Sequence, residues 1–168
     1  MGVSSVTARA APPPPSLRPY LPDDLPLLYE IRLSAIEELT ADDYDDPQRR
    51  AWAEAASDEE ELAATLKSGL SIVALREGAA IGFIVFKNGL IDQLYVHPAV
   101  ARTGVASALV DAVEKLAGAR QIKAIDVDAS DTAKPLFDRR GYVAQRRNTI
   151  SFDDVWLGNT RMRKTLSP

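Results

Sequence analysis

Cysteine is absent from this sequence of 168 residues, and histidine occurs once, at His97. Without cysteine there can be no disulfide bond and no catalytic thiolate. Zinc sites are built mainly from thiolates and imidazoles, so we expect no metal. No apolar run approaches the roughly 20 residues that cross a bilayer, and the N-terminus lacks the apolar core of a signal peptide. We therefore expect a cytoplasmic protein with no membrane partner.

Positive charge is not in excess either. The chain has 20 lysine and arginine residues against 24 aspartate and glutamate residues, a net charge of −4. This balance argues against nucleic acid as a partner. The sequence also lacks the Gly-Lys-Ser/Thr loop of P-loop proteins and the G-x-G-x-x-G turn of a Rossmann unit. Both of these nucleotide-binding folds are therefore disfavoured.

Alternating strand and helix patterns are present, and they fit one mixed α/β domain at residues 16–168. A flexible proline-rich tail is expected before it, at residues 1–15. Helix N-caps are predicted at Asp23 or Asp24 and at Ser57, the latter in a capping box with Glu60. The periodicities predict strands at residues 17–20, 71–75, 81–86, 91–96, 122–127, 142–152 and 156–166, and helices starting near residues 22, 47, 57, 105 and 132.

The most informative stretch runs from Ile91 to Val110. A strand pattern at 91–96 meets Pro98, and after Gly104 the residues Val105, Leu109, Val113 and Leu116 recur with helical spacing. The first N–H groups of a helix have no intrahelical partner and carry the positive end of the macrodipole. The small residues at the helix start can therefore form a phosphate cradle. The alternative is that they only permit a tight turn packed on a sheet.

Val96-His97-Pro98 followed by Gly104-Val105-Ala106 resembles the pyrophosphate-binding motif of the GNAT superfamily of N-acetyltransferases. Ala101 departs from it, because the family usually has Gln or Arg there; Arg102 can supply some of the missing charge. The resemblance implies acetyl-CoA as co-substrate. It also implies a mixed, mostly antiparallel sheet of six to seven strands with a central parallel β-α-β unit and helices on both faces. In that fold strand 91–96 splays from strand 122–127, and the pantetheine arm lies in the gap.

The resemblance also implies which residues contact the cofactor. The basic residues 134, 139 and 140 could approach the phosphates of the cofactor, or they could simply be solvated charges on a helix surface. The implied set is Leu94, Tyr95, Val96, Arg102, Thr103, Gly104, Val105, Ala106, Ser107, Lys134, Phe137 and Arg140.

Acetyl transfer to an amine needs a base, a hydrogen-bond donor to the thioester carbonyl and an acid for the leaving thiolate. By resemblance, the donor is the Val96 backbone N–H. Asp92 is the predicted base, on one strand face with Leu94 and Val96; the alternative is an edge aspartate or a cap partner. Further candidates for the base, or for contact with a cationic amine, lie in the acidic N-terminal half: Glu37, Glu38 and Asp43.

The sequence departs from the family motif at the position of the general acid. Phe137 stands where the family usually has a general-acid tyrosine, four residues before Gly141. Tyr142 is the predicted replacement, with Tyr95, Ser130, water or unaided departure of the thiolate as alternatives. The segment around Phe137 resembles a small bacterial subgroup of GNAT proteins that often has phenylalanine there.

The predicted function is direct acetyl transfer in a ternary complex to a primary amine of a small molecule or peptide. No covalent intermediate is expected, because cysteine is absent and no Ser-His arrangement is visible. The alternative is an inactive acyl-CoA-binding or protein-interaction module on the same fold. The final hairpin is exposed in this scheme, so homodimerisation through it is left open.

Overall fold

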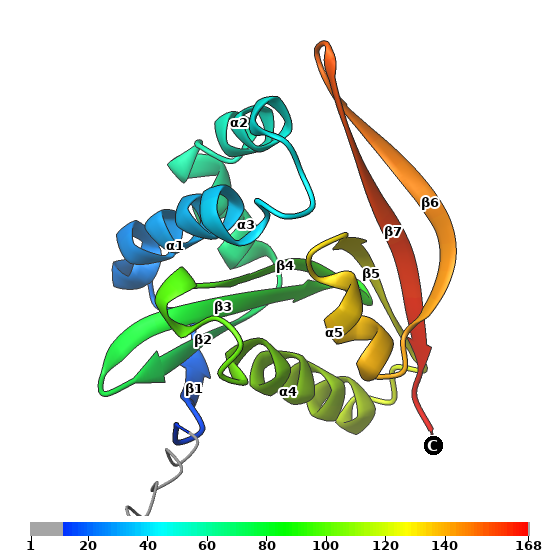
Figure 1. The fold of residues 1–168 in the computed structure, drawn as a ribbon. Helices are drawn as coiled ribbons and strands as arrows, with labels where there is room; N and C mark the ends of the chain where they lie inside the picture. The colour runs from blue at the N-terminus through cyan, green and yellow to red at the C-terminus, as the bar shows by residue number, and fades with distance from the viewer. Residues whose placement is uncertain (1–11, 168) are drawn as a thin grey trace, which may run out of the picture.

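One sheet of seven strands runs through residues 12–167, the part of the chain that a computed structural model describes (Figure 1). Its strand order is β1-β2-β3-β4-β5-β7-β6. Neighbouring strands are antiparallel except β4 and β5, which are parallel and linked by a crossover helix, α4. The predicted mixed α/β fold with a central β-α-β unit is confirmed.

The elements fall close to the predicted ranges. The strands are β1 (Ser16–Pro19), β2 (Leu70–Arg76), β3 (Ala79–Lys87), β4 (Leu90–Val96), β5 (Ala124–Ser130), β6 (Val143–Phe152) and β7 (Val155–Thr165). The helices are α1 (Leu25–Leu39), α2 (Asp46–Ala55), α3 (Glu59–Ser68), α4 (Val105–Ala119) and α5 (Lys134–Arg139), with short 3-10 turns η1 (Pro22–Asp24) and η2 (Pro98–Val100). No helix within residues 12–167 is long and apolar enough to span a membrane.

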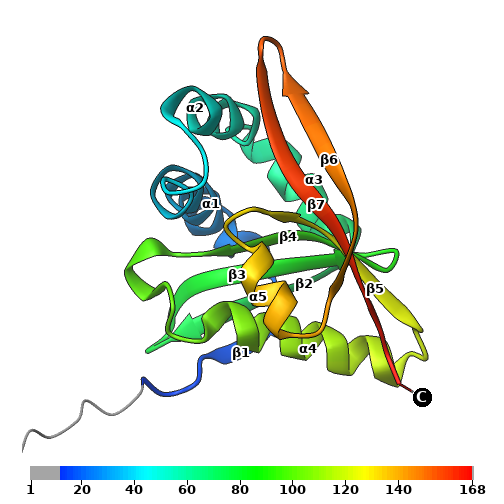
Figure 2. The ribbon, with the colours of Figure 1, turned by 45° about the vertical axis from the view of Figure 1, so that its right-hand side comes forward.

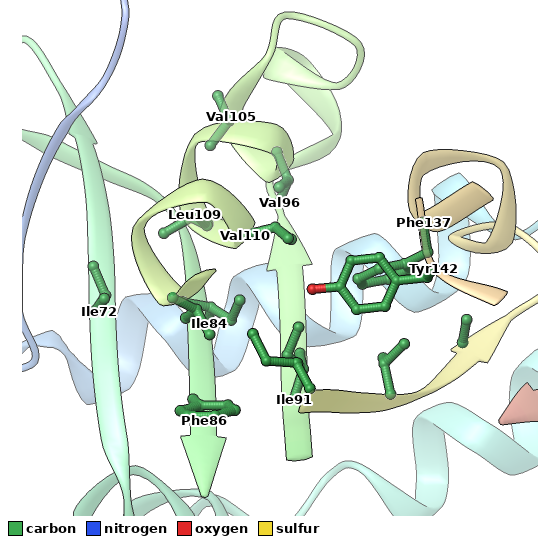
Figure 3. Close-up of a cluster of buried hydrophobic side chains, with 14 of the residues drawn as sticks. Ile72, Ile84, Phe86, Ile91, Val96, Val105, Leu109, Val110, Phe137 and Tyr142 are labelled. Carbon is green, nitrogen blue, oxygen red and sulfur yellow. The ribbon is translucent and has the colours of Figure 1, made fainter. Parts of the chain in front are cut away.

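Hydrophobic clusters cover the two faces of the sheet. On one face Ile84 and Phe86 of β3 pack with Leu109 and Val110 of α4 (Figure 3). On the other face Phe83 and its neighbours pack against α1 and α3. The almost wholly apolar β3 is explained by this arrangement, because a strand covered on both faces needs apolar residues at successive positions.

The parallel pair β4 and β5 touches only at one end. Leu90 pairs with Asp126 and Ile91 with Val127, and no later residue of β4 pairs with β5. The strands therefore diverge over the rest of β4, as the family resemblance implied. The side of β4 that faces away from β3 is left without a strand neighbour from Gln93 onward.

One predicted helix cap is confirmed in position and the other is wrong. Asp24 is the N-cap residue of α1, but its carboxylate accepts the Leu21 N–H at 2.8 Å and binds the Arg18 guanidinium at 2.7 Å, so it makes no side-chain cap hydrogen bond to α1. The cap of α3 is Asp58, which accepts the Glu61 N–H at 3.0 Å. Ser57 lies one residue too early, because its hydroxyl still donates to a carbonyl of α2.

Two predictions, the flexible N-terminal tail and homodimerisation through the final hairpin, are not tested by the structure. The first 11 residues of the predicted tail lie outside the described residues, and residues 12–15 have no regular secondary structure. The strand β6 forms one edge of the sheet, and most of its side chains are exposed. Together β6 and β7 form a long hairpin that rises beside α2 (Figure 2). Homodimerisation through this hairpin stays a prediction.

Candidate active site

The gap between β4 and β5 opens into a groove of about 880 Å³. This volume falls in the range of small-molecule sites, roughly 300–1,000 Å³. Its walls come from β4, the end of β5, the loop and first turn of α4, α5, and the connection between α1 and α2. The strand-turn-helix motif singled out in the sequence thus lies along one wall.

The turn before α4 presents free backbone donors to this groove. Arg102 and Gly104 both have positive φ, 62° and 89°, which turns the chain sharply into the helix. None of the N–H groups of residues 102–107 donates a hydrogen bond within the described part of the chain. A Cβ atom built on Gly104 would meet nothing within 4 Å. The bend is therefore open, as a phosphate cradle requires.

The open edge of β4 offers a second set of backbone groups. The His97 N–H donates to the Ile81 carbonyl of β3 at 2.8 Å. Hydrogen-bonded positions alternate along an antiparallel pair, so the N–H and C=O groups of Leu94 and Val96 point away from β3. They point into the gap where β5 has diverged, and an extended ligand can pair with them there.

Asp92 lies where the ladder between β3 and β4 is irregular. Val85 pairs with Gln93 and the next residue, Phe86, pairs with Ile91, so Asp92 is the extra residue of a β-bulge. The bulge interrupts the strict alternation from which Asp92 was predicted to share a strand face with Leu94 and Val96, and Ile91 takes the buried position in the core. The exposed Asp92 side chain lines the groove instead from the bulge.

A second, smaller hollow of about 280 Å³ adjoins the groove. The residues that line both spaces are Trp52, Asp92, Tyr95, Asp128 and Ser130. The other walls of the hollow come from Tyr44 and from the β6–β7 hairpin. Two ligands can therefore approach the same point from different directions, with Asp92 and Ser130 where they meet.

Most of the residues predicted for the cofactor lie on the groove, and six of the predicted site residues lie elsewhere. The residues on its walls are Asp43, Asp92, Leu94, Tyr95, Val96, Arg102, Gly104, Val105, Ala106, Ser107 and Phe137. The residues outside its lining are Glu37, Glu38, Thr103, Lys134, Arg140 and Tyr142.

Two of the three basic residues in and just after α5 are held by acidic neighbours. The Lys134 ammonium binds Asp138 on the same helix at 2.9 Å. The Arg140 guanidinium binds Glu114 at 2.8 Å and Asp111 at 3.3 Å, both on α4. Arg139 lies between them in the sequence and lines the groove. Helical spacing alone could not tell which arginine faces the groove, because that depends on how α5 docks against α4.

Three more predicted residues, Glu37, Glu38 and Thr103, lie outside the groove for simple reasons. Glu37 and Glu38 are exposed on α1. The Thr103 hydroxyl donates to the Val100 carbonyl at 2.6 Å and accepts from Arg76 at 3.3 Å, which stabilises the loop before α4. Thr103 therefore stabilises the loop without lining the groove.

Tyr142 is buried behind Phe137. The two rings meet edge to face with centroids 4.9 Å apart, and only 3% of Tyr142 is exposed. Its hydroxyl has no hydrogen-bond partner within the described residues and is turned into the hydrophobic cluster (Figure 3). Burial, and then the charge of Glu114, raises the pKa of Tyr142 far above its usual value. A hydroxyl in this position does not reach the groove.

Replacing Tyr142 by phenylalanine is therefore expected to leave kcat unchanged. It should also raise the free energy of unfolding by up to about 1 kcal/mol, because an unpaired buried hydroxyl is removed. Steady-state kinetics and urea denaturation measure the two effects. A fall in kcat of tenfold or more with unchanged stability would restore Tyr142 as the acid.

The phenol group of Tyr95, which lines the groove, is expected to titrate only at high pH. Its ring packs against Phe83 with centroids 5.8 Å apart, and burial raises its pKa to about 12. An unfolded tyrosine has a pKa of about 10. The contribution of Tyr95 to the free energy of unfolding is therefore complete below about pH 10, and it is lost as the pH rises from about 10 to about 12. We expect the Tyr95→Phe variant to lose less stability over this range in denaturation experiments. An equal loss in both proteins would contradict the shift.

No local sequence pattern indicates the second hollow. Trp52 reads as an ordinary apolar residue of α2, and Asp128 as one of several acids on a strand. Trp52 and Asp128 line the same hollow because Tyr44, which lies just before α2, joins this part of the chain to β7. The Tyr44 hydroxyl donates to the Gly158 carbonyl of β7 at 2.7 Å. The same hydroxyl accepts the Asp131 N–H at 2.9 Å. Contacts between residues so distant in sequence leave no periodic signal.

Comparison with known proteins agrees with this geometry. Residues 40–166 match the family described as the Acetyltransferase (GNAT) domain, which is more than half of the chain. The chain belongs to the GNAT family of acetyltransferases. The uncharacterized N-acetyltransferase YafP of Escherichia coli (strain K12) is 33% identical over 147 residues, covering 88% of this chain and 93% of that protein.

Solved GNAT structures share the fold. A GCN5-related N-acetyltransferase from Rhodopseudomonas palustris superposes with a TM-score of 0.88 at 48% identity, over 92% of this chain and 97% of the other. The PaiA N-acetyltransferase from Thermoplasma acidophilum, solved in complex with coenzyme A, has a TM-score of 0.73 at 16% identity, over 90% and 98% of the two chains. The second likeness shows the GNAT fold alone.

Proposed function

We propose that this GNAT protein transfers the acetyl group of acetyl-CoA to a primary amine by direct attack in a ternary complex. The observation that carries the proposal is the open turn before α4, whose N–H groups at residues 102–107 have no partner in the described chain. A diphosphate needs such donors, and the positive end of the α4 macrodipole favours its charge. Arg102 and Arg139 line the groove and add positive charge.

The open edge of β4 suits the pantetheine arm. Its amides can pair with the free backbone groups of Leu94 and Val96, in the manner of an added strand. In the proposed complex the thioester carbonyl lies near the Val96 N–H, which donates a hydrogen bond to the oxygen as negative charge develops. Acetyl-CoA supplies the acetyl group as a thioester, and the chain supplies orientation and donors.

The amine reaches the same point from the second hollow. Asp92 lines both spaces and can take the proton that the ammonium must lose before attack. The Ser130 hydroxyl also lines both, and its oxygen accepts the Ala133 N–H at 3.1 Å, which leaves its proton free for the leaving sulfur. A free thiol has a pKa of about 8.5, so the thiolate can also leave near neutral pH without an acid.

Phe137 is the observation that favours an alternative. It lines the groove at the position of the usual tyrosine, and a phenyl ring cannot donate a proton. A non-catalytic acyl-CoA-binding module on the same fold would bind the cofactor and release no thiol.

The test combines calorimetry with a thiol-release assay. We expect acetyl-CoA to bind, and free CoA thiol to accumulate when amines, peptides and polyamines are screened. Binding without thiol release across the whole screen would favour the non-catalytic module. If acetyl-CoA does not bind at hundreds of micromolar, both the acetyltransferase and the non-catalytic acyl-CoA-binding module are excluded.

A further inference from the structure

The second hollow has an aromatic lining. Tyr44 and Trp52 meet edge to face with centroids 5.6 Å apart, and Tyr95 and Phe152 line the hollow with them. The β6–β7 hairpin adds apolar side chains at the same end as Phe152, namely Ile150 and Leu157. Such walls favour an aromatic ring, which gains area burial and edge-to-face contacts.

Within the described residues, the carboxylates that line the hollow are those of Asp92 and Asp128. Asp128 accepts from the Arg161 guanidinium at 2.6 and 2.9 Å and from the Asn148 amide at 3.0 Å, so its charge is neutralised. Asp92 has no ion-pair partner in the described part of the chain. Within residues 12–167, no lysine or arginine lines the hollow. An acceptor with one ammonium group matches this charge, whereas an acceptor carboxylate would lie near Asp92 without a cation to bind.

A second ammonium would also be unmatched. Away from Asp92 the lining holds no second free carboxylate among the described residues: Asp128 is already occupied by Arg161, and Ser130 and Asn159 are polar but uncharged. Burying a charge without a partner is costly, so long polyamines are disfavoured. The volume of about 280 Å³ equals that of roughly nine liquid waters, which suits a molecule with about as many non-hydrogen atoms.

We infer that the acceptor is a compact arylalkylamine: an aromatic ring on a short chain that ends in one primary amine, without a carboxylate or a second cation. This inference rests on the proposed acetyl transfer. The ammonium end lies at Asp92, which removes a proton, and the ring lies between Trp52 and Phe152. The nitrogen lone pair then forms a bond to the thioester carbon, the carbon–sulfur bond breaks, and the electron pair leaves with sulfur. The nitrogen loses a second proton, sulfur gains one, and the products are an amide and a free thiol.

The substrate test compares three amines at fixed acetyl-CoA. We expect kcat/KM for 2-phenylethylamine to exceed that for phenylalanine, which adds only a carboxylate, by about tenfold or more, as one misplaced charge warrants. Spermidine should likewise be at least about tenfold poorer. If spermidine or phenylalanine is the better substrate, the arylalkylamine inference is overturned while acetyl transfer stands. If none of the three, and no amine or peptide of the wider screen, releases thiol, the proposed function itself fails.

The two tryptophans of the chain provide matched variants. Trp52→Ala should raise KM for 2-phenylethylamine at least about tenfold, because an aromatic contact surface is lost. Trp156→Ala should leave it unchanged, since Trp156 is 64% exposed and lies outside both spaces. In Trp156→Phe, where Trp52 is the remaining tryptophan, 2-phenylethylamine should change the emission with CoA present. Equal KM values in the two alanine variants, or unchanged emission in Trp156→Phe, would overturn the placement of the ring.

Discussion

Replacing Gly104 by tyrosine is expected to lower the affinity for acetyl-CoA by about 100-fold or more, which corresponds to about 2.7 kcal/mol. The space beside Gly104 is open, and the proposed diphosphate needs that space to reach the N–H groups of the turn. A tyrosine side chain would occupy it. Isothermal titration with acetyl-CoA measures the change directly.

The control is Gly78→Tyr, because Gly78 shares the features that make a substitution at Gly104 strained. Its φ is 81°, and a Cβ built on it also meets nothing within 4 Å. It lies in the turn between β2 and β3, away from the groove lining. Both variants therefore carry the left-handed cost of about 1–2 kcal/mol, but Gly78→Tyr should bind acetyl-CoA normally. Equal affinity in the two variants would show that the cofactor binds elsewhere.

Asp92→Asn is expected to reduce kcat by about 100-fold to 10,000-fold, the usual range for loss of a general base. The dissociation constant for acetyl-CoA should stay within about twofold, because the proposed role of Asp92 is at the amine, and Asp92 lines the hollow away from the turn before α4. The residual rate should rise with pH, since a larger fraction of the free amine is then already deprotonated. Steady-state kinetics over a range of pH tests both expectations.

Asp154→Asn serves as the matched control, because Asp154 is an exposed residue of the turn between β6 and β7. It should keep the activity of the unmodified protein. If Asp92→Asn behaves in the same way, the base must be another group, and Asp43 on the groove wall is the next to change.

The part of the site that could be predicted is the part built from consecutive residues. The strand, turn and helix from β4 to α4 are specified by local patterns: alternation, then Pro98 and Gly104, then the apolar stripe that begins at Val105. Backbone groups form the open turn, so its chemistry follows from chain direction and needs little from side chains. This explains why a short motif predicted the fold as well as this wall of the groove.

The remaining features depend on tertiary packing. The bulge at Asp92 is one extra residue in a ladder, and strict alternation cannot reveal it. Arg140 is held on α4 and Arg139 is left at the groove by the docking angle of α5. Tyr142 is buried because its ring packs edge to face on Phe137 within the hydrophobic cluster.

The most direct test of the account is a crystal structure of the protein with coenzyme A. The account predicts the diphosphate within hydrogen-bonding distance of the N–H groups at residues 102–107. It also predicts the pantetheine arm between β4 and β5, paired with Leu94 and Val96. Coenzyme A bound at any other surface, with the turn before α4 empty, would contradict it.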